Sequence, residues 1–256
     1  NHKWSDDTTA DVTVSWSIAK FNLSNASIAT IGEQTYTGSA IKPTPAVSVA
    51  LKAGNTTLTT GTHFTYSYAD NTNVGTAKLT ITAVNNTNYT GSKTVEFTIK
   101  TRGIAVPTAN TSTFTYTGSE QTYLPANWES IKAYVEIKGN TRTNAGSQTV
   151  TVSLKDAINN TWSDDTTQAK TFTFTIGRAK TAVLPTQKGT LTYNNTVQSP
   201  EWNNYDTVKL TIGGTTEGSN AGSYTATFTP TANYAWSDGT TTAKNATWTI
   251  GKASMG

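Results

Sequence analysis

The chain has 256 residues, only 14% of them charged, and a formal net charge of +3 at pH 7. Its Lys and Arg residues are spread along the chain, which argues against a nucleic-acid surface because phosphate binding needs clustered cations. The absence of Cys excludes disulfides and thiolate metal sites. No run of apolar residues is long enough to cross a membrane as a helix, so we expect neither nucleic-acid binding nor membrane insertion.

About a fifth of the residues are Thr, a β-branched residue that favours half-buried strands. The good helix formers Glu, Leu, Met and Arg are scarce. No segment carries apolar residues at helical spacing over three turns. The composition therefore predicts an all-β protein.

Three short patterns recur in constant order and divide the chain into repeats of about 75 residues. An aromatic residue, a hydroxyl residue and Ile close each repeat, and these isoleucines, at 18, 99, 176 and 250, are 81, 77 and 74 residues apart. A Thr-Tyr pair opens the repeats at 35, 115 and 192, and Asn-x-Gly follows at 73, 144 and 220. We expect domains at 20–101, 102–178 and 179–253, after a remnant of an upstream repeat at 1–19 and before a tail at 254–256.

The sequence WSDDTT at residues 4–9 returns at 162–167 and, as WSDGTT, at 236–241. Both later copies lie just before a closing strand. We therefore interpret residues 1–18 as the final hairpin of a repeat whose first three quarters are missing. Either a longer array was cut within a repeat, which we favour, or the hairpin is completed by something outside its own repeat, such as another copy. Because two strands alone are marginal in water, we expect this hairpin to pack against the first full repeat or a neighbouring chain.

Strands with one buried face are predicted after each Asn-x-Gly and at each repeat end, because apolar residues alternate with Thr, Ser, Lys or Gln. The expected inward residues are Ala77, Leu79, Ile81 and Ala83; Val150, Val152 and Leu154; Tyr224, Ala226 and Phe228; and, in the closing strands, Val12, Val14, Trp16 and Ile18; Val95, Phe97 and Ile99; Phe172, Phe174 and Ile176; Ala246, Trp248 and Ile250. Residues 127–138 align with 205–212, which alternate, so both segments are predicted as strands. Asn-x-Gly and Asp238-Gly239 are typical of tight turns.

No Gly/Ser-rich or Pro-rich linker separates the repeats. A closing strand runs into the next repeat within a few residues, as in Ile99-Lys-Thr-Arg102. We expect the repeats to stand end to end as a stiff rod, on the order of 35 Å for each repeat and roughly 100 Å for all three.

These residues resemble bacterial immunoglobulin-like repeats, in particular the type called MBG domains. The first repeat is similar through YTGSAIKPTPAV (36–47) and LTTGTHFTYSYADNTNVGTAKLTITAVNNTNYTGSKTVEFTI (58–99). The third resembles a related type of Firmicutes surface proteins and phage structural proteins through NAGSYTATFTPTANYAWSDGTTTAKNATWTIGKA (220–253), and the second is a more divergent relative of the third.

The resemblance implies a tandem array of three immunoglobulin-like β-sandwich domains preceded by a partial repeat. It also implies an extracellular location, on a bacterial cell surface or a phage virion. In the third repeat, Tyr224 resembles the tyrosine corner of immunoglobulin sandwiches, in which the hydroxyl bonds to nearby backbone.

Catalysis is not supported by the sequence. A His-based triad could use only His2 or His63, and neither lies in a recognisable motif. Paired acids at Asp6/Asp7 and Asp164/Asp165, and the alternating oxygen ligands of residues 70–75, faintly suggest calcium, but turn chemistry is the better interpretation. We expect no enzymatic activity, no cofactor and no metal.

Trp128 and Trp202 occupy equivalent places shortly after a Pro. Either could stack on a sugar ring as a ligand contact, but a core anchor is the preferred interpretation. A Lys–Asn isopeptide cross-link through Lys20 or Lys180 and Asn245 is a further alternative, without an assignable catalytic acid.

The leading hypothesis is a non-enzymatic stalk or spacer of tandem modules from a larger bacterial surface or phage virion protein. Its partners would be neighbouring repeats of a longer chain and other copies in a surface or virion assembly. The alternative is an adhesion module that binds a host glycan or protein receptor through loops and exposed aromatic residues.

Overall fold

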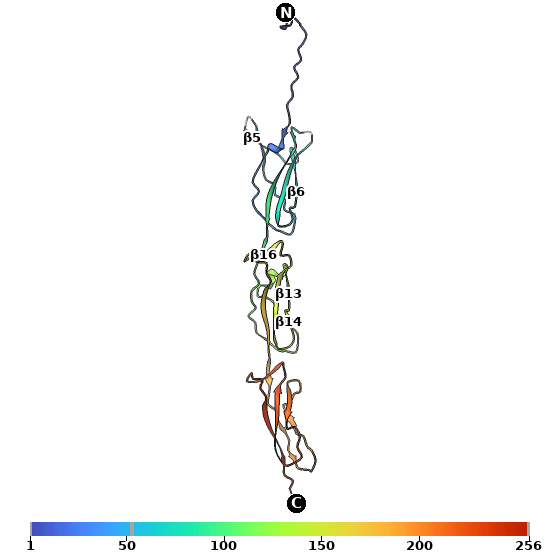
Figure 1. The fold of residues 1–256 in the computed structure, drawn as a ribbon, viewed down its shortest axis with the longest axis vertical. Coiled ribbons are helices and arrows are strands. Elements are labelled where there is room, and N and C mark those ends of the chain that lie inside the picture. Colours follow the sequence, from blue (N-terminus) through green and yellow to red (C-terminus); the bar gives the residue numbers. More distant parts are fainter. Residues whose placement is uncertain (1, 52–53, 86, 255–256) are drawn as a thin grey trace. The chain divides into compact units, whose positions relative to one another are not determined.

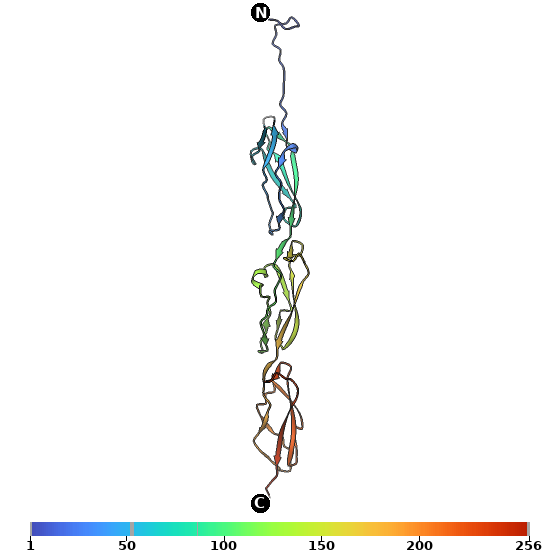
Figure 2. The same cartoon turned by 90° about the vertical axis from the view of Figure 1, so that its left-hand side faces the viewer.

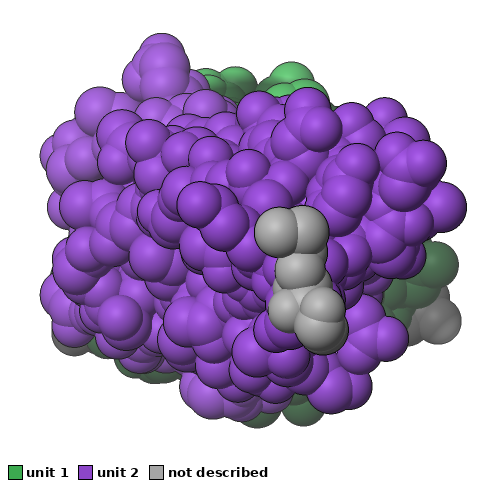
Figure 3. Space-filling model, turned by 90° about the horizontal axis from the view of Figure 1, so that it is seen from below, with its two compact units in different colours: residues 1–103, 156–161 green, residues 104–155, 162–256 purple. Residues whose placement is uncertain are grey.

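The computed structural model describes residues 2–51, 54–85 and 87–254, so residues 255–256 of the predicted tail and residue 1 of the predicted remnant lie outside it. The chain forms two compact units, residues 1–103 with 156–161 and residues 104–155 with 162–256 (Figure 3). The fold is an all-β, multi-domain sandwich, as the composition predicts.

Three four-stranded sheets with the same strand order recur among the described residues. In each, a two-residue strand pairs in parallel with the closing strand, which pairs antiparallel with a nine-residue strand and through it with an edge strand. The long strands run side by side in both views (Figures 1 and 2). In spatial order the sheets are β3 (Gln34–Thr35), β9 (Ser92–Lys100), β7 (Gly75–Ala83) and β6 (Phe64–Ala69); β11 (Phe114–Thr115), β17 (Lys170–Gly177), β15 (Gly146–Leu154) and β13 (Val135–Lys138); β20 (Leu191–Thr192), β25 (Lys244–Gly251), β23 (Gly222–Pro230) and β22 (Leu210–Gly214).

Shorter strands complete the described architecture. The smaller sheets are β2 (Ser27–Ile28), β4 (Val47–Leu51) and β5 (Gly54–Thr57); β12 (Gln121–Thr122) and β14 (Thr141–Arg142); β19 (Thr186–Lys188) and β21 (Glu201–Asn203). Three further two-stranded pairs are β1 (Phe21–Asn22) with β8 (Tyr89–Thr90), β10 (Arg102–Ile104) with β16 (Asn160–Trp162), and β18 (Ala179–Ala182) with β24 (Tyr234–Trp236). The helices are a 3-10 turn at Leu23–Asn25 and α1 (Trp128–Ile131).

The predicted alternation of the long strands is confirmed by burial. The fully buried members of the series include Leu79, Ile81, Val150, Val152, Ala226, Phe228, Phe174 and Trp248, whereas Ala83, Val95, Phe172 and Tyr224 are half-buried. The register aligns the repeats, because Gly75, Gly146 and Gly222 lie opposite Ile99, Ile176 and Ile250. Each Asn-x-Gly therefore turns the chain into a strand paired with the closing strand.

The prediction of strands at 127–138 and 205–212 is wrong in the first half of both segments. Residues 128–131 form α1, in which the Lys132 N–H donates to the Trp128 carbonyl at 2.9 Å. In the other segment the Asp206 carboxylate accepts from the Val208 N–H at 2.9 Å, and the strand begins only at Leu210. Local hydrogen bonds to short polar side chains compete with the ladder here and favour turns.

The prediction that residues 12–18 form a packed closing strand is also wrong. No strand is assigned between residues 2 and 20, and Trp16 and Ile18 are 80% and 81% exposed. The segment lacks the neighbours that its counterparts β17 and β25 have on both sides. Alternating apolar residues without a sheet to join have nothing to bury their inward face, so the pattern alone does not make a strand.

Candidate functional site

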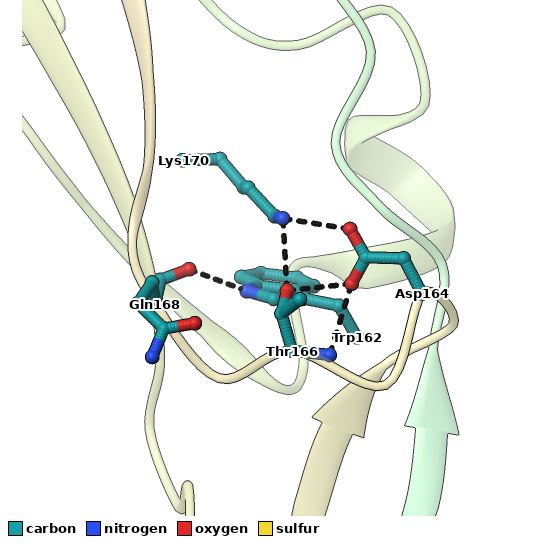
Figure 4. A network of polar contacts seen from close by, with 5 residues as sticks. All are labelled: Trp162, Asp164, Thr166, Gln168 and Lys170. Atoms are coloured by element: carbon teal, nitrogen blue, oxygen red, sulfur yellow. Dashed lines mark hydrogen bonds and ion pairs between the residues drawn. The ribbon is translucent and has the colours of Figure 1, made fainter.

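The repeated Trp-Ser-Asp hexamer forms a tight turn held by its own side chains, shown for the second repeat in Figure 4. The Trp162 N–H donates to the Thr166 carbonyl at 2.8 Å, and its indole Nε1–H donates to the Gln168 carbonyl at 2.8 Å. Asp164 Oδ1 accepts from the N–H and the hydroxyl of Thr166 at 3.1 and 2.6 Å. Lys170 Nζ donates to Asp164 Oδ2 at 2.8 Å. The bulky ring of Trp162 is fully buried in the core, so this turn attaches a loop to the sandwich.

The Asp–Thr bonds recur in all three copies of the hexamer, and the position of the second acid explains why Gly replaces it once. Asp7 and Asp165 have φ values of 62° and 60°, and Gly239 has 85°. Gly adopts this left-handed region without strain, and Asp tolerates it better than most residues. The turn that the sequence predicts at these residues is confirmed by this geometry.

In the second and third repeats, Asp164 and Asp238 bond both to the turn and to a lysine. The Lys170 ammonium next to Asp164 lowers the pKa of that carboxyl from 3.8 to about 2, and Lys244 lowers the pKa of Asp238 in the same way. A bound ammonium occupies the face that a cation would need. In the described part of the chain, no group of three or more His, Asp or Glu side chains is placed to hold a metal ion.

His63 has a structural partner. Its Nδ1 accepts from the Thr59 N–H at 2.8 Å, and its ring meets the edge of Tyr89 with 5.4 Å between the ring centres. The ring therefore closes the turn that leads into β6. His2 is exposed at the start of the described chain.

Trp128 and Trp202 are both half-buried and lie in different local structures. Trp128 is the first residue of α1 and packs on the core that contains Ile131 and Trp162. Trp202 lies on β21, with its ring edge-on to Phe228 at 4.9 Å between centres. One side of Trp202 lines an open hollow of about 510 Å³ that Tyr205 also lines. The structure thus places the two residues in cores, with part of Trp202 accessible.

The expected cross-link residues do not meet the requirement for burial. Lys20, Lys180 and Asn245 are all exposed. The tyrosine corner is confirmed as a contact: the Tyr224 hydroxyl donates to the Asn220 carbonyl at 2.7 Å, and its ring stacks on Trp248 at 4.4 Å between centres.

Two asparagines form a contact that the sequence pattern did not predict. Asn233 lies just before β24, and its carbonyl accepts from the Ala179 N–H at 3.0 Å. Its side-chain Oδ1 accepts from the Ala145 N–H at 2.9 Å, and its Nδ2 donates to Asn144 Oδ1 at 3.0 Å. One residue therefore fixes both the strand that opens its own repeat and the Asn-x-Gly turn of the preceding repeat, within the same compact unit.

Asn159 makes the same contact with the first repeat. Its carbonyl accepts from the Arg102 N–H at 3.0 Å, and its Oδ1 accepts from the Val74 N–H at 2.8 Å. Its Nδ2 donates to Asn73 Oδ1 at 3.3 Å and to Asp156 Oδ2 at 2.9 Å. Asn159 is one of two buried polar residues among those described. We call each such Asn, with the turn it holds, a joint.

A ring completes each joint. The Arg102 guanidinium lies over the Tyr36 ring, 5.3 Å from its centre, and Tyr234 meets Tyr116 edge-on at 5.4 Å. Tyr36 and Tyr116 hold equivalent places, because their N–H groups donate to the residue after the closing Ile, Lys100 or Gly177. A signal was present in the sequence, since Asn88 and Asn233 each directly precede a Tyr, and Asn159 and Asn233 each lie three residues before a Trp.

No protein-family model and no curated protein matches the chain. A solved structure of the Bacteroides ovatus mixed-linkage glucan utilization locus SGBP-B, in complex with a mixed-linkage heptasaccharide, is similar to it at 14% identity. The similarity covers 89% of this chain and 71% of that one, with a TM-score of 0.19. Among the described residues, no helix combines the length and apolar character needed to cross a membrane.

Proposed function

We propose that this chain is a non-enzymatic spacer, a series of immunoglobulin-like modules of an extracellular surface or virion protein that holds other parts of an assembly apart. The observation that carries the proposal is the recurrence of the joint. At each joint one Asn side chain holds the turn of one repeat while its carbonyl holds the first strand of the next. A binding domain that only needed flexible attachment would have no use for such a contact.

The short connections between successive repeats support the same proposal. β9 ends at Lys100 and β10 begins at Arg102, and β17 ends at Gly177 and β18 begins at Ala179. A single connecting residue leaves few backbone dihedrals free, so bending at a joint requires its hydrogen bonds to break.

Small-angle scattering on the full chain tests the spacer. The proposal expects one extended particle whose longest dimension stays the same between low and high salt, because each clamping Asn holds its turn through amide hydrogen bonds and not through an ion pair. Curves that require a broad ensemble of freely bending repeats contradict it.

The hollow beside Trp202 favours a second candidate, adhesion to a glycan. Trp202 and Tyr205 line the hollow, together with the ion pair of Lys188 and Glu201. Aromatic faces with nearby polar groups suit sugar rings. A glycan array with the wild type, Trp202→Ala and the surface variant Lys188→Met discriminates: binding that is lost in both variants supports adhesion, and no binding by the folded wild type removes it.

A further inference from the structure

At each joint, the Asn-x-Gly turn and the Tyr that follows the opening Thr belong to one repeat, and the clamping Asn belongs to the next. We call the turn and the Tyr the receiving half of the joint, and the third repeat carries it in the same form as the first two. Its turn is Asn220-Ala221-Gly222, and Gly222 lies opposite Ile250 as the earlier glycines lie opposite their closing Ile residues. The Tyr193 N–H donates to the Gly251 carbonyl at 2.9 Å, as the N–H groups of Tyr36 and Tyr116 do at their joints. The backbone that would receive a clamping Asn is therefore fully formed.

This third receiving half is uncovered in the described structure. Val74 and Ala145, the residues held in the two joints, are half-buried, whereas Ala221 is exposed. No hydrogen bond to the Ala221 N–H is formed by any residue that the structure describes. The ring of Tyr193 is 36% exposed, whereas its counterparts Tyr36 and Tyr116 are half-buried beneath Arg102 and Tyr234.

The uncovered residues together line one hollow of about 470 Å³. Its lining consists of Tyr193, Asn220, Ala221, Lys252 and Ala253. Each has its counterpart in a joint, because Lys252 and Ala253 follow Ile250 as Arg178 and Ala179 follow Ile176. The surface that is hollow here is filled at both joints by an Asn side chain with a guanidinium or an aromatic ring.

We propose that this hollow is a docking site for a further repeat of the same type, joined in series after Ala253, whose clamping Asn accepts a hydrogen bond from the Ala221 N–H. The proposal rests on the proposed spacer function and identifies the repeat that would dock next in the spacer. Attachment in series is chosen because the third residue after the closing Ile, Arg102 or Ala179, donates its N–H to the clamping Asn at each joint. Ala253 occupies this place after Ile250.

A second copy of this chain is the competing occupant, since it would offer Asn88. The Asn88 carbonyl accepts from the Phe21 N–H at 2.9 Å, as at the joints. In a docked second copy, however, residues 19–21 would have to enter the place that residues 251–253 already hold. Docking of separate copies therefore meets a steric conflict that attachment in series avoids.

The experiment appends a second copy of residues 180–253 directly after Ala253, which keeps the register of the existing joint at Ala179. Amide hydrogen exchange is then measured by NMR at Ala221 in the parent and extended chains, with Ala145 as the internal reference. We expect the exchange of Ala221 to slow by roughly five- to tenfold, the factor for one hydrogen bond of ordinary net strength. The matched control is the extended chain with Asn233→Ala in the appended copy alone, in which Ala221 should return to the parent rate while Ala145 stays protected.

Equal exchange of Ala221 in the parent and extended chains, with the appended repeat folded by its own NMR dispersion, overturns the proposal. Protection of Ala221 in the parent that grows with protein concentration also overturns it, in favour of a second copy. The scattering test of the spacer is separate. If Ala221 is protected from exchange but scattering shows that the array bends freely, the docking site is supported and the stiff spacer is contradicted.

Discussion

At the scale of single residues, the side-chain amide of Asn has a role at the joints that a carboxylate could not fill. It offers a donor and an acceptor on a side chain with a single methylene group, so Asn159 and Asn233 each bind a turn through both atoms while their own carbonyls bind a strand. Asp could accept from Val74 or Ala145 but could not donate to Asn73 or Asn144. The joint as observed therefore uses both atoms of the amide.

Replacement of Asn233 by Ala should leave the Ala145 N–H without its hydrogen-bond acceptor and leave the fold intact. The Ala145 N–H loses its acceptor, which costs about 1 kcal/mol of stability, while the backbone bond from the Ala179 N–H remains. Amide exchange at Ala145 should speed up accordingly. Asn245→Ala, at an exposed position, is the control and should leave Ala145 unchanged; equal rates in both variants would contradict the role given to Asn233.

The Asp164 turn should make a contribution to stability that depends on pH. The pKa of Asp164 in the folded chain, about 2, lies below its ordinary value of 3.8, chiefly because of the hydrogen bond from Lys170. A lowered carboxyl pKa stabilises the folded state above pH 3.8, and this contribution is lost as the pH falls toward 2. Carboxyl NMR titration should show Lys170→Met raising the pKa of Asp164. The exposed Lys138→Met should not, and an unchanged pKa in Lys170→Met would refute the pairing.

At the scale of elements, the closing strands show that neighbouring strands determine whether a segment with alternating apolar residues joins a sheet. Trp16 and Trp248 occupy equivalent places, two residues before the closing Ile. Trp248 is fully buried, stacks on Tyr224 and donates its indole N–H to the Thr215 carbonyl at 2.7 Å. Trp16 is 80% exposed. Trp248 is buried because β25 pairs with strands on both sides, and Trp16 is exposed because its segment pairs with none.

Alanine at these two places should therefore have opposite outcomes. Trp248→Ala should cost about 3–5 kcal/mol, as expected for removing a buried aromatic side chain. Trp16→Ala should change the stability by less than about 0.5 kcal/mol, as for an exposed position. Denaturant unfolding followed by fluorescence measures both, and a large loss in Trp16→Ala would show that residues 12–18 are packed in solution.

At the scale of the whole molecule, the repeats have separate hydrophobic cores. The core around Leu79 and Phe97 shares no residue with the core around Phe228 and Trp248. Separate cores unfold separately unless their interfaces are large. What connects the repeats is then a few hydrogen bonds and rings at each joint, and the proposed spacer function depends on them.

Loss of the Asn159 side chain should loosen the connection between the first and second repeats without unfolding them. Because the sequence has no Cys, spin labels can be placed at single introduced cysteines, Glu96→Cys and Thr173→Cys, both exposed. We expect the distance distribution between them to broaden in Asn159→Ala, because bending at this joint no longer breaks the hydrogen bond to Val74. The control is Asn233→Ala, whose joint lies outside the labelled span, and identical distributions in both variants and the parent would show that the Asn159 joint does not limit bending.

Much of the fold follows from local pattern. Alternation placed Leu79, Val152 and Phe228 in the core because side chains on a strand point to opposite faces. The turn at Asp164 could be predicted because short polar side chains bond to backbone two residues on. The predictions failed at Trp128 and Asp206, where turn-forming hydrogen bonds compete with a ladder over a segment that alternates.

The sequence by itself determined the repeats, their registers, their buried faces and the Trp turns, because each depends on residues close together in the chain. Only the tertiary structure decided which alternating segments became strands, since residues 12–18 carry the pattern of β25 and lack its neighbours. The tertiary structure also revealed the joints, because Asn159 and Val74, or Asn233 and Ala145, are more than 80 residues apart and meet only once each repeat has folded.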